Sequence, residues 1–255
     1  MTTDYKITRL RSVAITIVVF GHSIILYDPQ WELYKTVYTV DLLMWIKRII
    51  NTFQMPLFLF LSGFCFFYSI KRHDYHSVKS VIKGIEGKAK RLLVPFFVIA
   101  IVWMIPIRLL CRYNAWSGLK YSQIIKLVFL GFDSGHLWFL PTLFLIFVFA
   151  FIVFPYVSSK SIDFLILLIS FLEMMVIHKA PALLFLKNVI SSLYWFCLGF
   201  EVSKYNKIFG KNLGIKINYG IVFLSGTIIL LTIRGGEYIR RNAKNRCFIL
   251  AAGII

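Results

Sequence analysis

The chain has 255 residues, of which 59% are apolar, and its 29 Lys and Arg residues against 11 Asp and Glu residues give a formal net charge of +18. A soluble domain is about 45–50% apolar, and a soluble basic protein with so few acidic residues would show long polar faces instead of long apolar runs. The composition therefore excludes a disordered chain, a collagen-like fibre and an ordinary cytosolic enzyme. It predicts an all-α, polytopic transmembrane helical bundle with its positive charges in the loops, so membrane lipid and not nucleic acid is the expected partner.

Seven apolar runs approach the length of about 20 residues that lets a helix cross a bilayer. An eighth run begins at Cys247 and reaches Ile255 after nine residues, which are too few to span a membrane. We therefore expect a single membrane domain over residues 1–255 with an incomplete eighth span, its C-terminal part missing. The seven runs are Ser12–Tyr27, Ile49–Ile70, Leu92–Leu110, Leu137–Tyr156, Ile162–His178, Ala182–Ser203 and Ile217–Ile233.

The charges of the first two loops set the expected orientation. Seven Lys and Arg residues lie at positions 71–91, whereas the loop at residues 28–48 carries three basic and three acidic residues. The positive-inside rule then places residues 71–91 and the N-terminus in the cytoplasm, with the chain in the inner, cytoplasmic membrane. The basic loop at residues 234–246 disagrees, because this count of spans places it outside.

The first span carries two ionisable residues, Arg11 and His22. Eleven residues of helix make three turns plus about 20°, so the two side chains share one face, about 16.5 Å apart along the axis. Arg11 lies at the cytoplasmic rim, and His22 lies inside the membrane, where an imidazole stays largely neutral and suits a base. A structural histidine bonded to a neighbouring helix is the alternative, but ionisable residues inside spans are functional by default.

Two further segments place small or basic residues at the ends of spans. Ser62 and Gly63 let another backbone approach closely, and taken alone they indicate helix packing more than catalysis. Lys90 and Arg91 stand at the cytoplasmic start of the third span, on the same side as Arg11. Arginines in that position can grip phosphate groups with two hydrogen bonds.

The fourth span begins with His136 and Trp138 at its exported end. Trp138 is typical of an interface anchor, and His136 alone is weak evidence for a site. Two acidic residues lie in later spans. Glu173 could orient a histidine or serve a proton path, but polar packing is an equal alternative, and Glu201 is expected to snorkel beside Lys204.

Four segments in this order and spacing resemble the acyltransferase 3 family, whose members are polytopic membrane enzymes that O-acylate carbohydrates and related acceptors. The resemblance covers about residues 5–205. The segments are RSVAITIVVFGH, ending at His22, MPLFLFLSGF, containing Ser62 and Gly63, KRLLVPFF, containing Arg91, and HLWFLP, beginning at His136.

The resemblance implies acetyl-CoA or another acyl-CoA as cytoplasmic donor, with no permanently bound cofactor. It implies His22 and His136 as catalytic residues and Arg11 and Arg91 as donor-binding residues, and we expect Lys90 to assist them. Ser62, Gly63, Trp138 and Glu173 are expected in the substrate site or in packing. His22 would take the proton from an acceptor hydroxyl as it attacks the thioester, or a covalent acyl-enzyme would form. The sequence has no metal-ligand cluster, so no metal is expected.

A transporter or flippase for a polar or lipid-linked solute is the competing interpretation, because it would also be apolar, basic and polytopic. It would predict inverted repeats and broken helices in matching halves, and the sequence shows neither. We therefore expect an O-acetyltransferase-like enzyme that modifies a cell-surface carbohydrate or its lipid-linked precursor. Surface polysaccharide, lipid-linked sugar and peptidoglycan remain open as acceptors.

Overall fold

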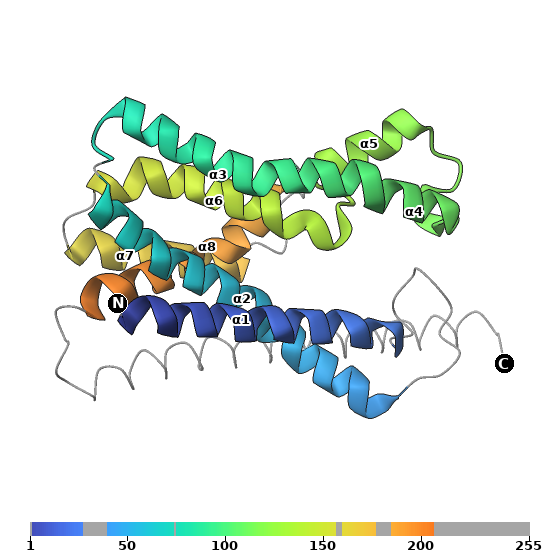
Figure 1. The fold of residues 1–255 in the computed structure, drawn as a ribbon, viewed down its shortest axis with the longest axis horizontal. Helices are drawn as coiled ribbons and strands as arrows, with labels where there is room; N and C mark the ends of the chain where they lie inside the picture. Colours follow the sequence, from blue (N-terminus) through green and yellow to red (C-terminus); the bar gives the residue numbers. More distant parts are fainter. Residues whose placement is uncertain (1, 28–39, 74, 157–159, 177–184, 207–255) are drawn as a thin grey trace.

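The computed structural model describes residues 2–27, 40–73, 75–156, 160–176 and 185–206. Every regular element within these ranges is helical, as the composition predicts. The predicted seventh span and the incomplete eighth lie outside the described residues. The long helices run back and forth along one common axis (Figure 1).

The first half of the chain forms two long helices and a third one that changes its winding near its end. α1 is Thr2–Ser23, followed by a 3₁₀ turn at Ile24–Tyr27, and α2 is Asp41–Arg72. α3, Val78–Ile99, begins where the Ser77 hydroxyl accepts a hydrogen bond from the Ser80 backbone N–H, which is an N-cap. A π-helical turn at Ala100–Met104 then joins α3 to α4, which is Ile105–Leu110.

The second half contributes one short helix and three long ones. A 3₁₀ turn at Asn114–Trp116 leads to α5, Tyr121–Phe129, which turns back along the end of α3 (Figure 1). A 3₁₀ turn at Gly135–Trp138 opens α6, Phe139–Val153, and another at Phe154–Tyr156 closes it. α7 is Lys160–Val176, and α8 is Leu186–Asn206.

The π-helical turn in the third predicted span is caused locally by proline. The Ile105 N–H donates to the carbonyl of Ala100, five residues earlier. Pro106 follows directly; it has no N–H to donate, and its ring crowds the carbonyl four residues before it in a regular α-helix. Inserting one extra residue into the turn relieves this conflict. The helix therefore continues to Leu110 instead of breaking at the proline.

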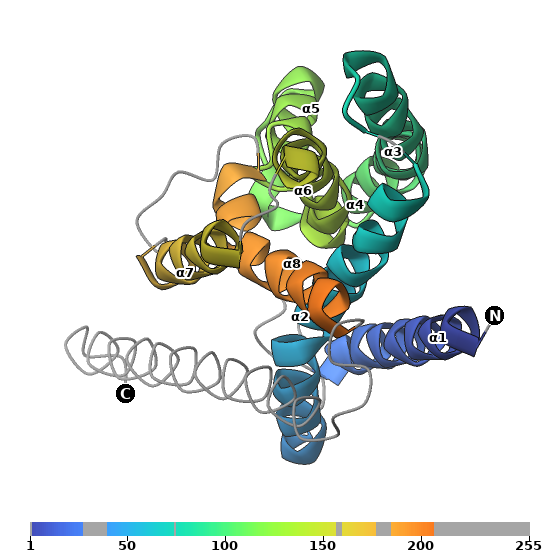
Figure 2. The same ribbon diagram turned by 90° about the vertical axis from the view of Figure 1, so that its left-hand side faces the viewer.

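α8 is the central helix of the described bundle, with α2, α6 and α7 around it (Figure 2). A methyl group on Gly63 of α2 would overlap the Phe196 carbonyl oxygen of α8, and one on Gly199 of α8 would overlap the Phe60 carbonyl oxygen of α2. The two helices thus touch through their backbones at glycines, as small residues allow in membrane proteins. Gly63 therefore lies in a close helix contact in the described bundle.

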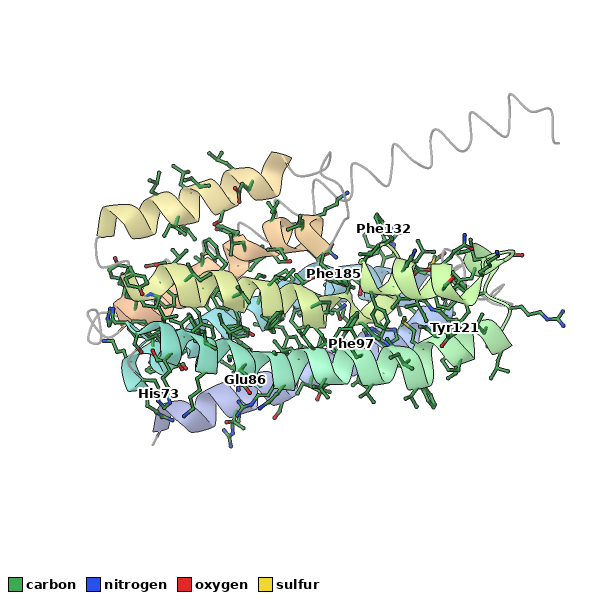
Figure 3. The ribbon with its side chains drawn as sticks, turned by 90° about the horizontal axis from the view of Figure 1, so that it is seen from above. His73, Glu86, Phe97, Tyr121, Phe132 and Phe185 are labelled. Atoms are coloured by element: carbon green, nitrogen blue, oxygen red, sulfur yellow. The ribbon has the colours of Figure 1, made fainter. Side chains whose placement is uncertain are left out.

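Two apolar clusters fill the interior. In the first, between α2, α6 and α8, Phe66 is 1% exposed, and its ring meets five others at centroid separations of 4.9–6.4 Å, those of Phe147, Phe151, Phe154, Phe196 and Phe200. The second lies between α3, α4, α5 and the turn before α6. There Phe185, labelled in Figure 3, packs edge-on against Phe96. The two clusters thus hold α3, α6 and the turn that carries His136.

Three helical stretches among the described residues are long and apolar enough to cross a membrane, namely Asp41–Arg72, Val78–Leu110 and Gly135–Tyr156. They correspond to the second, third and fourth predicted spans. The first, fifth and sixth predicted spans form α1, α7 and α8. These helices do not combine the length, the hydropathy and the low number of charges expected of a membrane-spanning helix; α7, for example, has 17 residues. The expected count of about seven spans is therefore not confirmed, although the chain is an apolar helical membrane protein.

The helix directions place several basic segments together. The start of α1, the turn between α2 and α3, and the end of α8 all lie at one end of the bundle (Figure 1). The segment between α4 and α5 lies at the other end. This arrangement agrees with the expectation that the N-terminus and residues 71–91 share one side of the membrane.

Candidate active site

The structure brings the two predicted catalytic histidines together. His22 lies at the end of α1, and His136 lies in the 3₁₀ turn that opens α6. Their ring centroids are 6.2 Å apart, with one ring edge-on to the other. Both side chains are exposed on the described surface. Residues far apart in the sequence thus form one imidazole pair.

The hydrogen bond of His22 determines which nitrogen can act as a base. Its Nδ1 lies 2.8 Å from the Val18 carbonyl oxygen. A carbonyl oxygen only accepts hydrogen bonds, so Nδ1 carries the proton and donates it. In the neutral ring the lone pair then lies on Nε2. His22 is therefore held in the tautomer that presents Nε2 as a proton acceptor.

Three cations from two helices gather nearer the N-terminal end of α1. The Lys88 ammonium lies within electrostatic reach of both Arg91 on α3 and Arg11 on α1. It also lies 3.8 Å from the centroid of the Phe147 ring, a cation–π contact that fixes its position. We call Arg11, Lys88 and Arg91 the cation group. Such a group suits a phosphate-bearing ligand, because ionised donors make strong hydrogen bonds to phosphate oxygens.

A buried ion pair supports the segment before His136. Arg108 of α4 donates from Nη1 to Asp133 Oδ1 at 2.9 Å, and Trp116 donates from Nε1 to Asp133 Oδ2 at 2.7 Å. The Arg108 and Asp133 side chains are only 10% and 25% exposed. We call Arg108, Trp116 and Asp133 the Asp133 clamp. The sequence analysis did not identify this group.

The family can now be identified. The sequence model of the acyltransferase 3 family, described as an acyltransferase domain, matches residues 4–252. The chain belongs to the acyltransferase 3 family. No curated protein and no solved structure matches it. The protein is accordingly a membrane acyltransferase, and the matched range includes both histidines, the cation group and the Asp133 clamp.

Lys90 of this acyltransferase lies apart from the cation group. Its Nζ forms an ion pair with Glu86 Oε1 at 2.7 Å, and both side chains are largely exposed; Glu86 is labelled on α3 in Figure 3. Helix geometry explains the difference, because Lys90 is about 160° around the axis from Lys88, whereas Arg91 is about 60° away. The spacing of three residues between Lys88 and Arg91 was the signal that could have identified Lys88.

The acyltransferase does not bring Glu173 to the histidine pair. Glu173 is exposed on α7, and α7 and α1 lie on opposite sides of α8 (Figure 2). Glu201 is 7% exposed, so the expectation that it snorkels to solvent is wrong. The reason is the central position of α8, whose residues from Ser192 to Glu201 are all buried.

The remaining predicted residues lie on the helices that hold the site. Ser62 is half-buried on α2, beside the Gly63 contact with α8. Trp138 is half-buried against the second apolar cluster, and its backbone carbonyl accepts a hydrogen bond from the Thr142 hydroxyl at 2.7 Å. These contacts anchor the turn that carries His136. Both residues therefore take part in the packing of the described bundle.

Proposed function

We propose that this membrane acyltransferase moves an acyl group, acetyl in the simplest case, from cytoplasmic acyl-CoA to a hydroxyl of a cell-surface carbohydrate or its lipid-linked precursor. The observation that carries the proposal is the His22–His136 pair, whose rings are 6.2 Å apart. The family assignment favours catalysis over the transporter alternative.

The cation group is the proposed donor site. CoA carries several phosphate charges at one end and its thioester at the other, joined by a long flexible arm. Arg11 and His22 lie on one face of α1, about 16.5 Å apart along the axis. Phosphates held by Arg11, Lys88 and Arg91 would let that arm extend along α1 and present the thioester to the histidines. Acyl-CoA acts here as a substrate, and no resident cofactor is required.

His22 is the proposed general base. Its Nε2 takes the proton from the acceptor hydroxyl, and the hydroxyl oxygen attacks the thioester carbonyl. The new C–O bond forms, the C–S bond breaks, and CoA leaves as a thiolate that recovers the proton from His22. His136, at the edge of the same ring pair, is placed to donate a hydrogen bond to the carbonyl oxygen as negative charge develops there. A covalent acyl-enzyme is the alternative route.

Acyl transfer in isolated membranes tests this proposal. With radiolabelled acetyl-CoA as donor, His22→Ala should abolish transfer to extracted glycans while the protein remains in the membrane. The matched control is Ser23→Ala on the same exposed turn, whose hydroxyl donates a hydrogen bond to the Phe20 carbonyl of its own helix, and it should keep wild-type transfer. Wild-type rates in His22→Ala would remove His22 as the base. The fraction that carries the label identifies the acceptor among polysaccharide, lipid-linked sugar and peptidoglycan.

A further inference from the structure

We propose that the Asp133 clamp positions His136 against His22, so that Arg108, Trp116 and Asp133 are positioning residues for acyl transfer. The inference rests on the proposed function, because the place of His136 matters only if the histidine pair performs the transfer. It assigns a role to buried charges that the proposed mechanism does not otherwise use.

The clamp uses both oxygens of one carboxylate. Arg108 donates to Oδ1 and Trp116 donates to Oδ2, at 2.9 and 2.7 Å. These partners come from α4, from the 3₁₀ turn that follows it, and from the segment before α6. A single carboxylate thus ties α4, the turn that follows it and the segment between α5 and α6 to one point. Two charge-assisted bonds in different directions leave it little freedom to rotate.

Aromatic rings restrict Arg108 as well. Its Cζ atom lies 4.7 Å from the centroid of the Tyr113 ring and 5.1 Å from that of Trp116. Those two rings are themselves edge-on at 5.5 Å. The guanidinium is therefore held both by its acid and by the faces of two rings. The guanidinium therefore has little freedom to move against the segment that carries His136.

The clamp reaches His136 through Gly135. A methyl group on Gly135 would overlap the Arg108 Nη2 atom, so the guanidinium lies directly against the backbone of that residue. Gly135 has φ +53°, in the left-handed region, and the Leu137 N–H closes the turn on the Ser134 carbonyl at 3.1 Å. His136 lies between these two constraints. The Arg108 charge also acts on the His136 ring.

A largely shielded ion pair in this position indicates more than stability. Desolvation of the two charges offsets much of their attraction, and apolar residues of similar volume commonly stabilise as well. Arg108 lies near the end of the apolar stretch Val78–Leu110, and ionisable residues in such stretches are rare and tend to be functional. Here the charged pair contacts the residue before a candidate catalytic histidine. Misplacing a catalytic group by about 1 Å can lower a rate about 100-fold, so a rigid clamp has a direct effect on transfer.

The first test separates turnover from donor binding. Asp133→Asn in the full chain should lower kcat about 100-fold and leave the KM for acetyl-CoA within about threefold, because the cation group lies about three helical turns from the histidine pair along α1. Arg108→Lys should be milder, since lysine keeps the charge but lacks the planar fork. The control Lys126→Gln, an exposed cation on α5, should match wild type. A rise in KM with unchanged kcat would overturn the proposal.

The second test measures the position of His136 without activity. His22→Cys and His136→Cys are combined in a chain whose four native cysteines are replaced by alanine, with a protease site in the turn between α2 and α3. A short bifunctional thiol reagent should join the two halves efficiently. Adding Asp133→Asn should reduce that cross-linking at least fivefold, and adding Lys126→Gln should not.

The two readings distinguish failure of the clamp from failure of the proposed function. Cross-linking that is unchanged by Asp133→Asn, or that never occurs, overturns the clamp. Cross-linking that falls while kcat stays at the wild-type level shows that the clamp places His136, but it overturns the role of the clamp in acyl transfer and removes His136 from the proposed mechanism. A fall in both cross-linking and kcat supports the clamp and the proposed function together. Because Asp133→Asn removes a buried charge, equal membrane insertion and monodisperse elution in detergent are required of each variant, and Arg108→Lys provides the milder substitution if Asp133→Asn fails.

Discussion

Two lysines on α3, only two positions apart, have different surroundings. Lys88 is half-buried over Phe147 and within reach of two arginines, whereas Lys90 is exposed and paired with Glu86. An exposed pair four residues apart on a helix contributes about 0.3–0.5 kcal/mol. A cation held beside a phosphate site makes a charge-assisted bond of about 1.5–3 kcal/mol. The helix face on which a lysine lies therefore determines its surroundings more than its position in the sequence does.

Lys88→Gln should raise the KM for the proposed acyl-CoA donor about 10- to 100-fold, with a smaller change in kcat, because a bond to phosphate is made equally in the ground state and the transition state. Lys90→Gln is the matched control and should leave KM unchanged. Initial rates in membranes over a range of acetyl-CoA concentrations measure KM and kcat for each variant. Equal effects of the two substitutions would contradict the assignment of the cation group.

Gly135 and Gly118 offer a second comparison between single residues. Both have positive φ, +53° and +78°, but a methyl group on Gly118 meets nothing within 4 Å, while one on Gly135 meets Arg108. Alanine at either position carries a backbone strain of about 1–3 kcal/mol. Gly135→Ala should in addition lower kcat by about 10-fold or more, because it displaces the guanidinium behind His136. Comparable kcat values in the two variants would argue against that contact.

At the scale of elements, α2 and α8 pack with their backbones in direct contact at Gly63 and Gly199. Gly63→Ala should destabilise the protein by about 1–3 kcal/mol, because the two helices must separate to admit the methyl group. Gly87→Ala on α3 is the control, since its methyl group meets nothing within 4 Å. There the helix gains about 0.5–1 kcal/mol from the better helix former. In detergent, the thermal unfolding temperature should therefore fall in Gly63→Ala and rise in Gly87→Ala. A change in the same direction in both variants would refute the packing role of Gly63.

Local patterns predicted the elements better than their ends. Apolar length identified the second, third and fourth spans, because crossing a bilayer is a local requirement. The third span was expected to begin at Leu92, but the helix begins at Val78, because Ser77 caps it and its first turns need not be apolar where they leave the membrane. Periodicity likewise placed Arg11 and His22 on one face, but it could not show which neighbour that face meets.

At the scale of the whole molecule, the fold creates contacts between residues that no local sequence pattern predicts. Only the fold brings His136 to His22 and joins Arg108 to Asp133, since each pair links segments that are distant along the chain. The family resemblance implied that both histidines are catalytic, but it did not predict that their rings lie together, and the Arg108–Asp133 pair was missed. Lys88, in contrast, could have been found from its spacing to Arg91. The orientation of the bundle in the membrane stays a prediction from loop charge.

Cysteine labelling measures that orientation. Cys111 is exposed beyond the end of α4, and Ser77 lies before α3, so the two positions flank the apolar stretch Val78–Leu110. An impermeant thiol reagent applied to intact cells should label Cys111 and should leave Ser77→Cys, in a Cys111→Ala background, unlabelled until the cells are opened. Labelling of position 77 in intact cells would reverse the topology. Cells that lack the protein serve as the control for background labelling.

The π-helical turn at Ala100–Met104 makes the third span sensitive to its length. Each residue of an α-helix advances the direction of the following side chains by about 100°, so the extra residue sets the azimuth of everything beyond it. Lys88 and Arg91 precede the turn, and Arg108 follows it. Removing one residue from this turn would keep the two cations in place and rotate Arg108 away from Asp133. The span thus tolerates apolar substitution there, whereas a change of one residue in its length would uncouple its two ends.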